Sequence, residues 1–164
     1  MNTPGLAPPT LPNAHAAALP VLPEAAVADV VEFFENLSPS SLGGIHHYYA
    51  ADAQFKDPFN TVQGVGAIAH IFLHMFDTLE EPRFVVRERV LQGQQCFLTW
   101  EFHFRFKGFR KGQAQIILGA SHLVFALDGK VTLHRDYWDA AEELYEKMPL
   151  LGSVMRWLKR RARA

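Results

Sequence analysis

The apolar residues of this chain change their spacing once, close to residue 82. Before that point they recur at intervals of three and four, as in amphipathic helices, and after it they alternate with polar residues, as in strands. The sequence predicts three helices, which begin at Pro23, at Ser38 and at about Gly66. It then predicts four strands, at residues 83–92, 95–107, 114–127 and 130–138, with a hairpin turn at Asp128-Gly129. Helices followed by a run of antiparallel strands indicate an α+β domain.

The strand predicted at 95–107 has two chemically different faces. Its even positions are all apolar, namely Cys96, Leu98, Trp100, Phe102, Phe104 and Phe106. Its odd positions include Glu101, His103 and Arg105, so that face is expected to meet solvent or another subunit. A long curved sheet with helices on its concave face encloses a cavity, and such cavities bind small molecules by default. We therefore expect a cone-shaped domain that forms a homodimer through its outer sheet face.

The composition limits the size of the domain and its partners. The 164 residues are expected to form one domain, at 23–139, with a core that needs no disulfide or metal. A formal net charge of −1 argues against nucleic-acid binding. Cys96 is the single cysteine, which leaves no internal disulfide or cysteine-based zinc site and fits the reducing cytoplasm. His70 and His74 share a helix face but lack an evident third ligand, so we expect no metal and no cofactor.

Two segments lie outside the expected domain. Residues 1–22 are rich in proline and alanine and hold no lysine or arginine, which indicates a flexible extension rather than a secretory signal. Residues 140–164 are expected to form an amphipathic helix that becomes basic from Arg156 onward. This basic end either complements the helix dipole, which we favour, or contacts an anionic membrane surface. No apolar run reaches the ~18 residues that a membrane-spanning helix needs.

Asp57 is the most informative single residue. It ends a short predicted strand, 54–57, which follows a helix-like run at 46–53, and Pro58 comes directly after it. A carboxylate held between aromatic residues at a strand end is a candidate general base in an apolar pocket. The alternative is that Asp57 only begins a turn, since Asp-Pro is common turn chemistry.

Residues 49–59, YAADAQFKDPF, resemble the ketosteroid isomerases and SnoaL-like polyketide cyclases of the NTF2-like superfamily. With the order of elements, the resemblance spans about residues 25–139. It implies three N-terminal helices packed on a strongly curved antiparallel sheet, with an added C-terminal helix. It also places Asp57 at the isomerase general base, which moves a proton between carbons beside a ketone. The two oxyanion donors of the isomerases fall on Phe33, which donates nothing, and on Ser121, which is the weaker acid.

The last predicted strand resembles the cyclases. Residues 130–136, KVTLHRD, match a pattern whose late aspartate is the acid/base, so the resemblance gives that role to Asp136. His134 and Trp138 share a strand face with Asp136. If Asp57 and Asp136 approach one cavity, their environments can divide acid and base roles between them. Alternatively, Arg135-Asp136 is a surface ion pair and His134 is a structural residue.

Three functions follow from these patterns. The first is a cofactor-independent isomerase or cyclase that removes a proton beside a carbonyl of a small hydrophobic substrate, with Asp57, Asp136 and His134 as catalytic residues. The second is a binding module that uses the same cavity without turnover, which the missing oxyanion donors favour. The third is a peripheral scaffold anchored by the basic tail. Ligand contacts in the first two are expected from Phe33, Tyr48, Phe55, Trp100, Ser121 and Trp138.

Overall fold

The structure is a computed structural model that describes residues 24–108 and 112–139. Its helices are α1 (Glu24–Glu35), the 3₁₀ helix η1 (Ser41–His47) and α2 (Val65–Thr78). Its strands are β1 (Tyr49–Lys56), β2 (Thr61–Gln63), β3 (Leu79–Gln92), β4 (Gln95–Phe106), β5 (Gln115–Phe125) and β6 (Val131–Tyr137). They form one sheet in the order β2-β1-β6-β5-β4-β3. The predicted α+β class is confirmed.

Some predictions concern parts of the chain outside the described residues. These are the extension at 1–22 and the basic helix at 140–164, including the added C-terminal helix of the predicted fold. The centre of the predicted loop after β4, at 109–111, also lies outside them. None of the described helices is both long enough and apolar enough to cross a bilayer.

The helix-like interpretation of residues 46–53 is wrong beyond η1, because Tyr49–Lys56 form strand β1. This strand runs parallel to β6 and pairs Phe55 with His134. Pairing with a distant segment gives the backbone of β1 its hydrogen bonds, which outweighs the helix preference of its alanines. The parallel pair also makes the sheet mixed, whereas the prediction was a wholly antiparallel sheet.

Strand β3 begins at Leu79, directly after α2, and not at residue 83 as predicted. Its pairing with β4 shifts register between Glu80 and Arg83, and Glu81 between them adopts a φ of 50°. Pro82 lies at this irregularity, where its missing N–H costs no regular ladder bond. The strand can therefore pass through a proline because β3 is an edge strand.

The two predicted faces of β4 are confirmed. Leu98, Trp100 and Phe104 are buried on the inner face, while Phe97 on the outer face is 47% exposed. Trp100 lies flat against β5 because its pairing partner there is Gly119. A Cβ on Gly119 would come within 2.3 Å of the Trp100 ring, so only glycine leaves the indole this position.

The predicted hairpin between the last two strands is confirmed, with a turn wider than two residues. The Ala126 N–H donates to the Lys130 carbonyl at 2.8 Å, and the Gly129 N–H donates to the Ala126 carbonyl. Gly129 adopts a φ of 83°, which glycine accepts without strain. This turn sets the register of β6, which carries Asp136.

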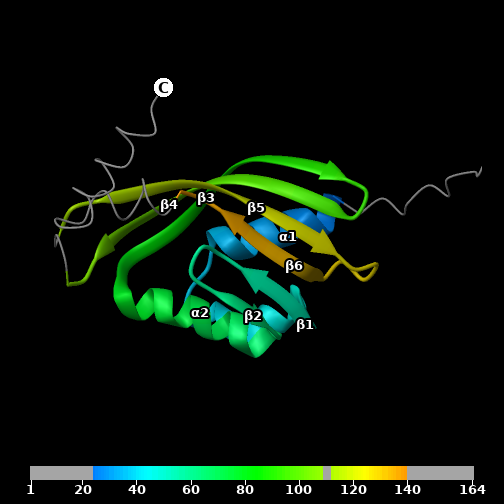
Figure 1. Cartoon of the computed structure of the whole chain (residues 1–164), viewed down its shortest axis with the longest axis horizontal. Helices are drawn as coiled ribbons and strands as arrows, with labels where there is room; N and C mark the ends of the chain where they lie inside the picture. The colour runs from blue at the N-terminus through cyan, green and yellow to red at the C-terminus, as the bar shows by residue number, and fades with distance from the viewer. Residues whose placement is uncertain (1–23, 109–111, 140–164) are drawn as a thin grey trace, which may run out of the picture.

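Figure 1 shows the long strands arching across one side of the molecule while α2 crosses the other. Helix α1 contacts β3, and α2 contacts both β1 and β3. Amphipathic spacing explains these contacts, because each helix turns one apolar face to the sheet. The buried helix residues are Val27, Val30, Phe33, Phe34, Ile68 and Phe72. The curvature leaves a space between α2 and the concave face of the sheet, and the candidate site lies there.

Candidate functional site

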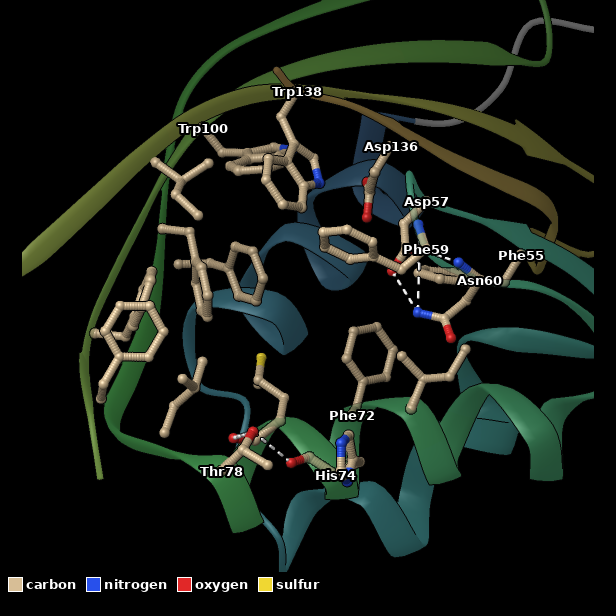
Figure 2. Close-up of a pocket in the computed structure, with 18 residues that line it drawn as sticks. Phe55, Asp57, Phe59, Asn60, Phe72, His74, Thr78, Trp100, Asp136 and Trp138 are labelled. Atoms are coloured by element: carbon tan, nitrogen blue, oxygen red, sulfur yellow. Dashed lines mark hydrogen bonds between the residues drawn. The ribbon is translucent and has the colours of Figure 1, made fainter. Parts of the chain in front are cut away.

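A cavity of about 320 Å³ opens between α2 and the inner face of the sheet. Its wall is mainly aromatic and includes Phe55, Trp100 and Trp138, three of the predicted ligand contacts. Asp57 and Asp136 both line it, so the two carboxylates border one cavity. Figure 2 shows Asp136 and Trp138 at the end of this space that is opposite His74 and Thr78 of α2.

The Asp57 carboxylate organises the turn between β1 and β2. Its Oδ1 accepts hydrogen bonds from the Phe59 N–H at 2.7 Å and the Asn60 N–H at 2.5 Å. The Asn60 amide nitrogen donates to Oδ1 at 3.1 Å and to Oδ2 at 2.9 Å. Both proposals for Asp57 therefore have structural support, because the residue builds a turn and also borders the cavity.

The Asp136 carboxylate is held differently. Its Oδ1 accepts a hydrogen bond from the Ser121 hydroxyl at 2.5 Å and is 2.8 Å from His134 Nε2. Its Oδ2 has no hydrogen-bond partner among residues 24–108 and 112–139. The side chain is 16% exposed. One oxygen is thus fixed by the protein, and the other is left for the cavity.

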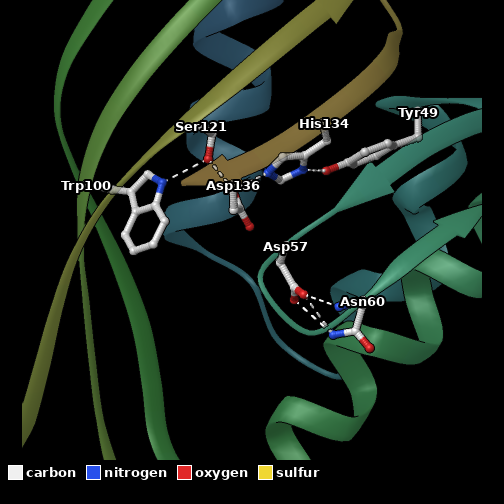
Figure 3. Close-up of polar contacts among 7 residues, drawn as sticks. All are labelled: Tyr49, Asp57, Asn60, Trp100, Ser121, His134 and Asp136. Atoms are coloured by element: carbon white, nitrogen blue, oxygen red, sulfur yellow. Dashed lines mark hydrogen bonds and ion pairs between the residues drawn. The ribbon is translucent and has the colours of Figure 1, made fainter. Parts of the chain in front are cut away.

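Ser121 and Asp136 face each other across β5 and β6, and the contact chain continues from both ends (Figure 3). The Trp100 indole N–H donates to Ser121 Oγ at 2.8 Å. At the other end, the Tyr49 hydroxyl is 2.6 Å from His134 Nδ1. The five residues form one continuous network that runs from the cavity wall into the core.

The hydrogen atoms of this network all point toward Asp136. Indole N–H can only donate, so the Ser121 hydroxyl accepts from Trp100 and passes its own hydrogen to Asp136. A carboxylate oxygen that already accepts from Ser121 also accepts from His134, which places the imidazole hydrogen on Nε2. His134 Nδ1 is then an acceptor, and the Tyr49 hydroxyl donates to it. This assignment pairs every side-chain N–H and O–H of the network, and it leaves Asp136 Oδ2 without a partner in the described part of the chain.

Tyr49 is the main functional residue that sequence reasoning missed. Burial, and secondarily the charge of Asp136, raise the pKa of Tyr49 well above its ordinary value of 10.0. The hydroxyl therefore keeps its hydrogen and remains a donor to His134. No local signal marks this role, because Tyr49 and His134 meet only through the parallel pairing of β1 with β6.

The other predicted site residues fall into two groups. Ser121 and His134 border a small hollow of about 20 Å³, which also touches Trp100 and Asp136. Phe33 and Tyr48 stack on each other with ring centroids 4.3 Å apart, and neither lines the cavity or the hollow. The structure does not bring Phe33 and Tyr48 to the cavity wall, and their role as ligand contacts stays a prediction.

Trp138 continues the inner face of β6 past Asp136. Its ring packs edge-on against Phe59 with centroids 5.4 Å apart. Its indole N–H has no hydrogen-bond partner in the described part of the chain, although it borders the cavity. It is therefore an unbonded donor at the end of the cavity where Asp136 also lies (Figure 2).

The alternative interpretation of Arg135 and Asp136 as a surface ion pair finds no support. Arg135 is exposed, and its guanidinium lies 4.9 Å from the centroid of the Tyr137 ring. Alternation along β6 turns the Asp136 side chain to the opposite, inner face. His70 and His74 on α2 are exposed, and the described residues contain no group of three metal-ligating side chains.

A family model for the SnoaL-like domain matches residues 30–134, which is more than half of the chain. The chain belongs to the SnoaL-like domain family. The match spans α1 to β6, so it covers Asp57, Ser121 and His134 and ends just before Asp136. No curated protein matches the sequence.

Solved structures share the fold of this SnoaL-like domain, among them NTF2-like and ketosteroid isomerase-like proteins. A ketosteroid isomerase-like protein from Catenulispora acidiphila, in complex with trimethylamine, has 17% identity and a TM-score of 0.61, covering 73% of this chain and 88% of its own. An NTF2-like protein of unknown function from Burkholderia pseudomallei has 17% identity and a TM-score of 0.62, covering 73% and 92%. An epoxide hydrolase of the LEH-like type from M. tuberculosis has 15% identity and a TM-score of 0.59, covering 82% and 94%. At these identities the likeness shows the fold alone.

Proposed function

We propose that this SnoaL-like domain is a cofactor-independent isomerase or cyclase. It removes a proton beside a carbonyl of a small, mostly apolar ligand, and Asp136 is the base. The observation that carries the proposal is the asymmetry of the Asp136 carboxylate: Ser121 and His134 hold Oδ1, and Oδ2 borders an apolar cavity of about 320 Å³.

Asp136 is better placed for this role than Asp57, which the resemblance favours. The oxygens of Asp57 already accept hydrogen bonds from Phe59 and Asn60. A proton delivered to Asp57 Oδ2 would share that oxygen with the Asn60 amide, and the hydrogen bonds of the turn, which stabilise the charged form, would weaken. A proton delivered to Asp136 Oδ2 displaces no protein group. Asp57 is therefore the second candidate for the acid/base. Its main contribution is to shape the cavity wall and to give it negative charge.

The reaction needs only atoms that the ligand and Asp136 supply. The C–H bond beside the carbonyl breaks, its electron pair moves into an enolate, and the proton goes to Asp136 Oδ2. The Trp138 N–H is the free donor that supports the proposal, because it can stabilise the enolate oxygen as charge develops there. Asp136 then returns the proton to another carbon, or the enolate carbon forms the new bond of a cyclisation.

Ser121, His134 and Tyr49 act through Asp136 and are positioning residues. Two donors on Oδ1 fix the plane of the carboxylate and so aim Oδ2 at the ligand. Preorganised geometry of this kind contributes to rate because the groups need not rearrange during the reaction.

Deuterium exchange tests the proposal. A panel of small cyclic ketones is incubated with the protein in deuterium oxide, and loss of the C–H signals beside the carbonyl is followed by NMR. Asp136→Asn is expected to reduce exchange by about 10²-fold or more, the usual contribution of a general base. Asp52→Asn, the same change on an exposed part of β1, is the control and keeps the wild-type rate. Wild-type exchange in Asp136→Asn, with loss in Asp57→Asn, would transfer the role to Asp57.

The second candidate is a binding module that holds the same ligand without turnover. The scarcity of donors favours it, because the Trp138 indole carries the one unbonded side-chain N–H at the Asp136 end of the described cavity wall. A missing oxyanion donor typically costs about 2.7–4 kcal/mol of transition-state stabilisation. In this case ligands perturb the NMR signals of the cavity residues, but no ketone of the panel exchanges above the protein-free rate.

A further inference from the structure

The charge of the cavity wall is as informative as its shape. Nine aromatic rings line the cavity, seven from phenylalanine and two from tryptophan, together with the carboxylates of Asp57 and Asp136. No lysine or arginine of residues 24–108 and 112–139 lines it. The described wall thus carries two carboxylates and no lysine or arginine to neutralise them, and its one histidine, His74, lies at the end opposite Asp136 (Figure 2).

Amides, a hydroxyl and an imidazole provide the hydrogen bonds to these carboxylates. Asp57 is bonded by the backbone and side-chain amides of its own turn. Asp136 is bonded by the Ser121 hydroxyl and by His134 Nε2. With His134 in its neutral tautomer, none of these donors cancels the charge of the carboxylate that it holds.

The nearby cations are turned elsewhere. Lys56 and Arg135 are exposed pairing partners in the sheet, and neither forms an ion pair with Asp57 or Asp136 in the described structure. Lys107 follows the last residue of β4, and its ammonium donates to the Phe76 and Asp77 carbonyls of α2. The compensating charge for the cavity has therefore to come with the ligand.

We propose that the ligand of this cavity is an organic cation, an apolar molecule that carries an ammonium group, held by the aromatic rings and by the negative charge of the Asp136 carboxylate, with Oδ2 left facing the C–H bond. A neutral apolar ligand would strip water from Oδ2 and return no partner, which is costly for a charged group. A cation in the ligand compensates the charge of the Asp136 carboxylate. It is also attracted to the negative faces of the surrounding rings. The inference rests on the proposed function only in placing the ligand in the cavity that Asp136 lines.

The same cation would assist the proposed chemistry. An enolate formed beside two carboxylates is disfavoured by repulsion, and Trp138 is the one free N–H donor at the Asp136 end of the described wall. A positive charge within the substrate offsets that repulsion as the enolate forms. The substrate class is then a small carbonyl compound that also bears an amine or quaternary ammonium.

Two probes of nearly equal shape, phenyltrimethylammonium and tert-butylbenzene, test the inference. The first has a positively charged nitrogen where the second has a neutral carbon. Each is titrated into the full chain, and binding is read from the indole N–H signals of Trp100 and Trp138 by NMR. The cation is expected to bind at least about tenfold more tightly, as a desolvated cation–π contact predicts. The preference should fall in Asp136→Asn, where the rings and Asp57 retain part of it, and persist unchanged in Asp52→Asn.

Equal or tighter binding of tert-butylbenzene would overturn the inference, as would an ammonium probe that leaves both indole signals unchanged. If the preference for the cation is unchanged in Asp136→Asn, the Asp136 carboxylate does not hold the cation. These failures are distinct from failure of the proposed function. Asp136-dependent deuterium exchange of neutral ketones would persist if only the charge preference were wrong, whereas loss of exchange alone would leave a cation-binding module.

Discussion

Replacing Tyr49 with phenylalanine isolates the buried end of the network. The ring and its packing remain, and only the hydroxyl that donates to His134 Nδ1 at 2.6 Å is removed. The His134 side chain is 5% exposed, so water cannot easily replace this donor. The ring cannot change tautomer without turning a bare nitrogen toward Asp136 Oδ1. A buried acceptor left without a partner costs about 1–3 kcal/mol, and we expect Tyr49→Phe to lower the free energy of unfolding by that amount.

Urea unfolding followed by circular dichroism measures this change, with Tyr137→Phe as the matched control. Tyr137 is 46% exposed on the outer face of β6, so losing its hydroxyl is expected to change the unfolding free energy by less than about 0.5 kcal/mol. Deuterium exchange should also slow in Tyr49→Phe, because the plane of the Asp136 carboxylate is less well fixed, while ligand affinity is retained. A Tyr49→Phe protein as stable as the wild type would contradict the buried hydrogen bond between Tyr49 and His134.

Three further predictions follow from other parts of the fold. Gly119→Ala places a Cβ about where the Trp100 ring lies, 2.3 Å from its nearest atom, and should destabilise the protein by about 1–3 kcal/mol and shift the Trp100 indole N–H signal in NMR spectra. Above about pH 10 the unfolded chain loses the Tyr49 proton that the folded protein keeps, so the free energy of unfolding should fall by up to about 1.36 kcal/mol per pH unit. Burial also raises the pKa of Cys96 from 9.0 to about 11, which makes the free energy of unfolding fall with pH in the same direction. The Tyr49 contribution is therefore the difference between the wild type and Tyr49→Phe, measured by urea unfolding across this pH range. If the exposed outer sheet face forms the predicted homodimer, Leu118→Lys, at a position 60% exposed in the single chain, should yield monomers in light scattering, and an unchanged mass would contradict that interface.

Much of the fold was predictable because it follows from local periodicity. The alternation in 95–107 correctly separates the buried face with Trp100 from the exposed face with Phe97. The same alternation along β6 correctly puts His134 and Asp136 on one face. Such patterns need only a strand and a core, and both are visible in a single sequence.

The parts that failed depend on which strands become neighbours. The strand predicted at 54–57 matches the end of β1, but the first part of β1, residues 49–53, has the local composition of a helix, and only the distant partner β6 makes it a strand. Ser121 was identified as a possible donor to the ligand, whereas the β5–β6 register makes it the partner of Asp136. Tyr49 and Gly119 were missed for the same reason. A single sequence does not state the register between strands, and this site is assembled by register.

Deuterium exchange of the ketone panel by Asp136→Asn, measured beside Asp57→Asn and the wild type, tests the central claim most directly. Asp136 Oδ2 is the one carboxylate oxygen of the described cavity that no protein group occupies. The account therefore predicts that Asp136→Asn loses exchange by about 10²-fold or more, while Asp57→Asn retains more of it. Wild-type exchange in Asp136→Asn would contradict the account.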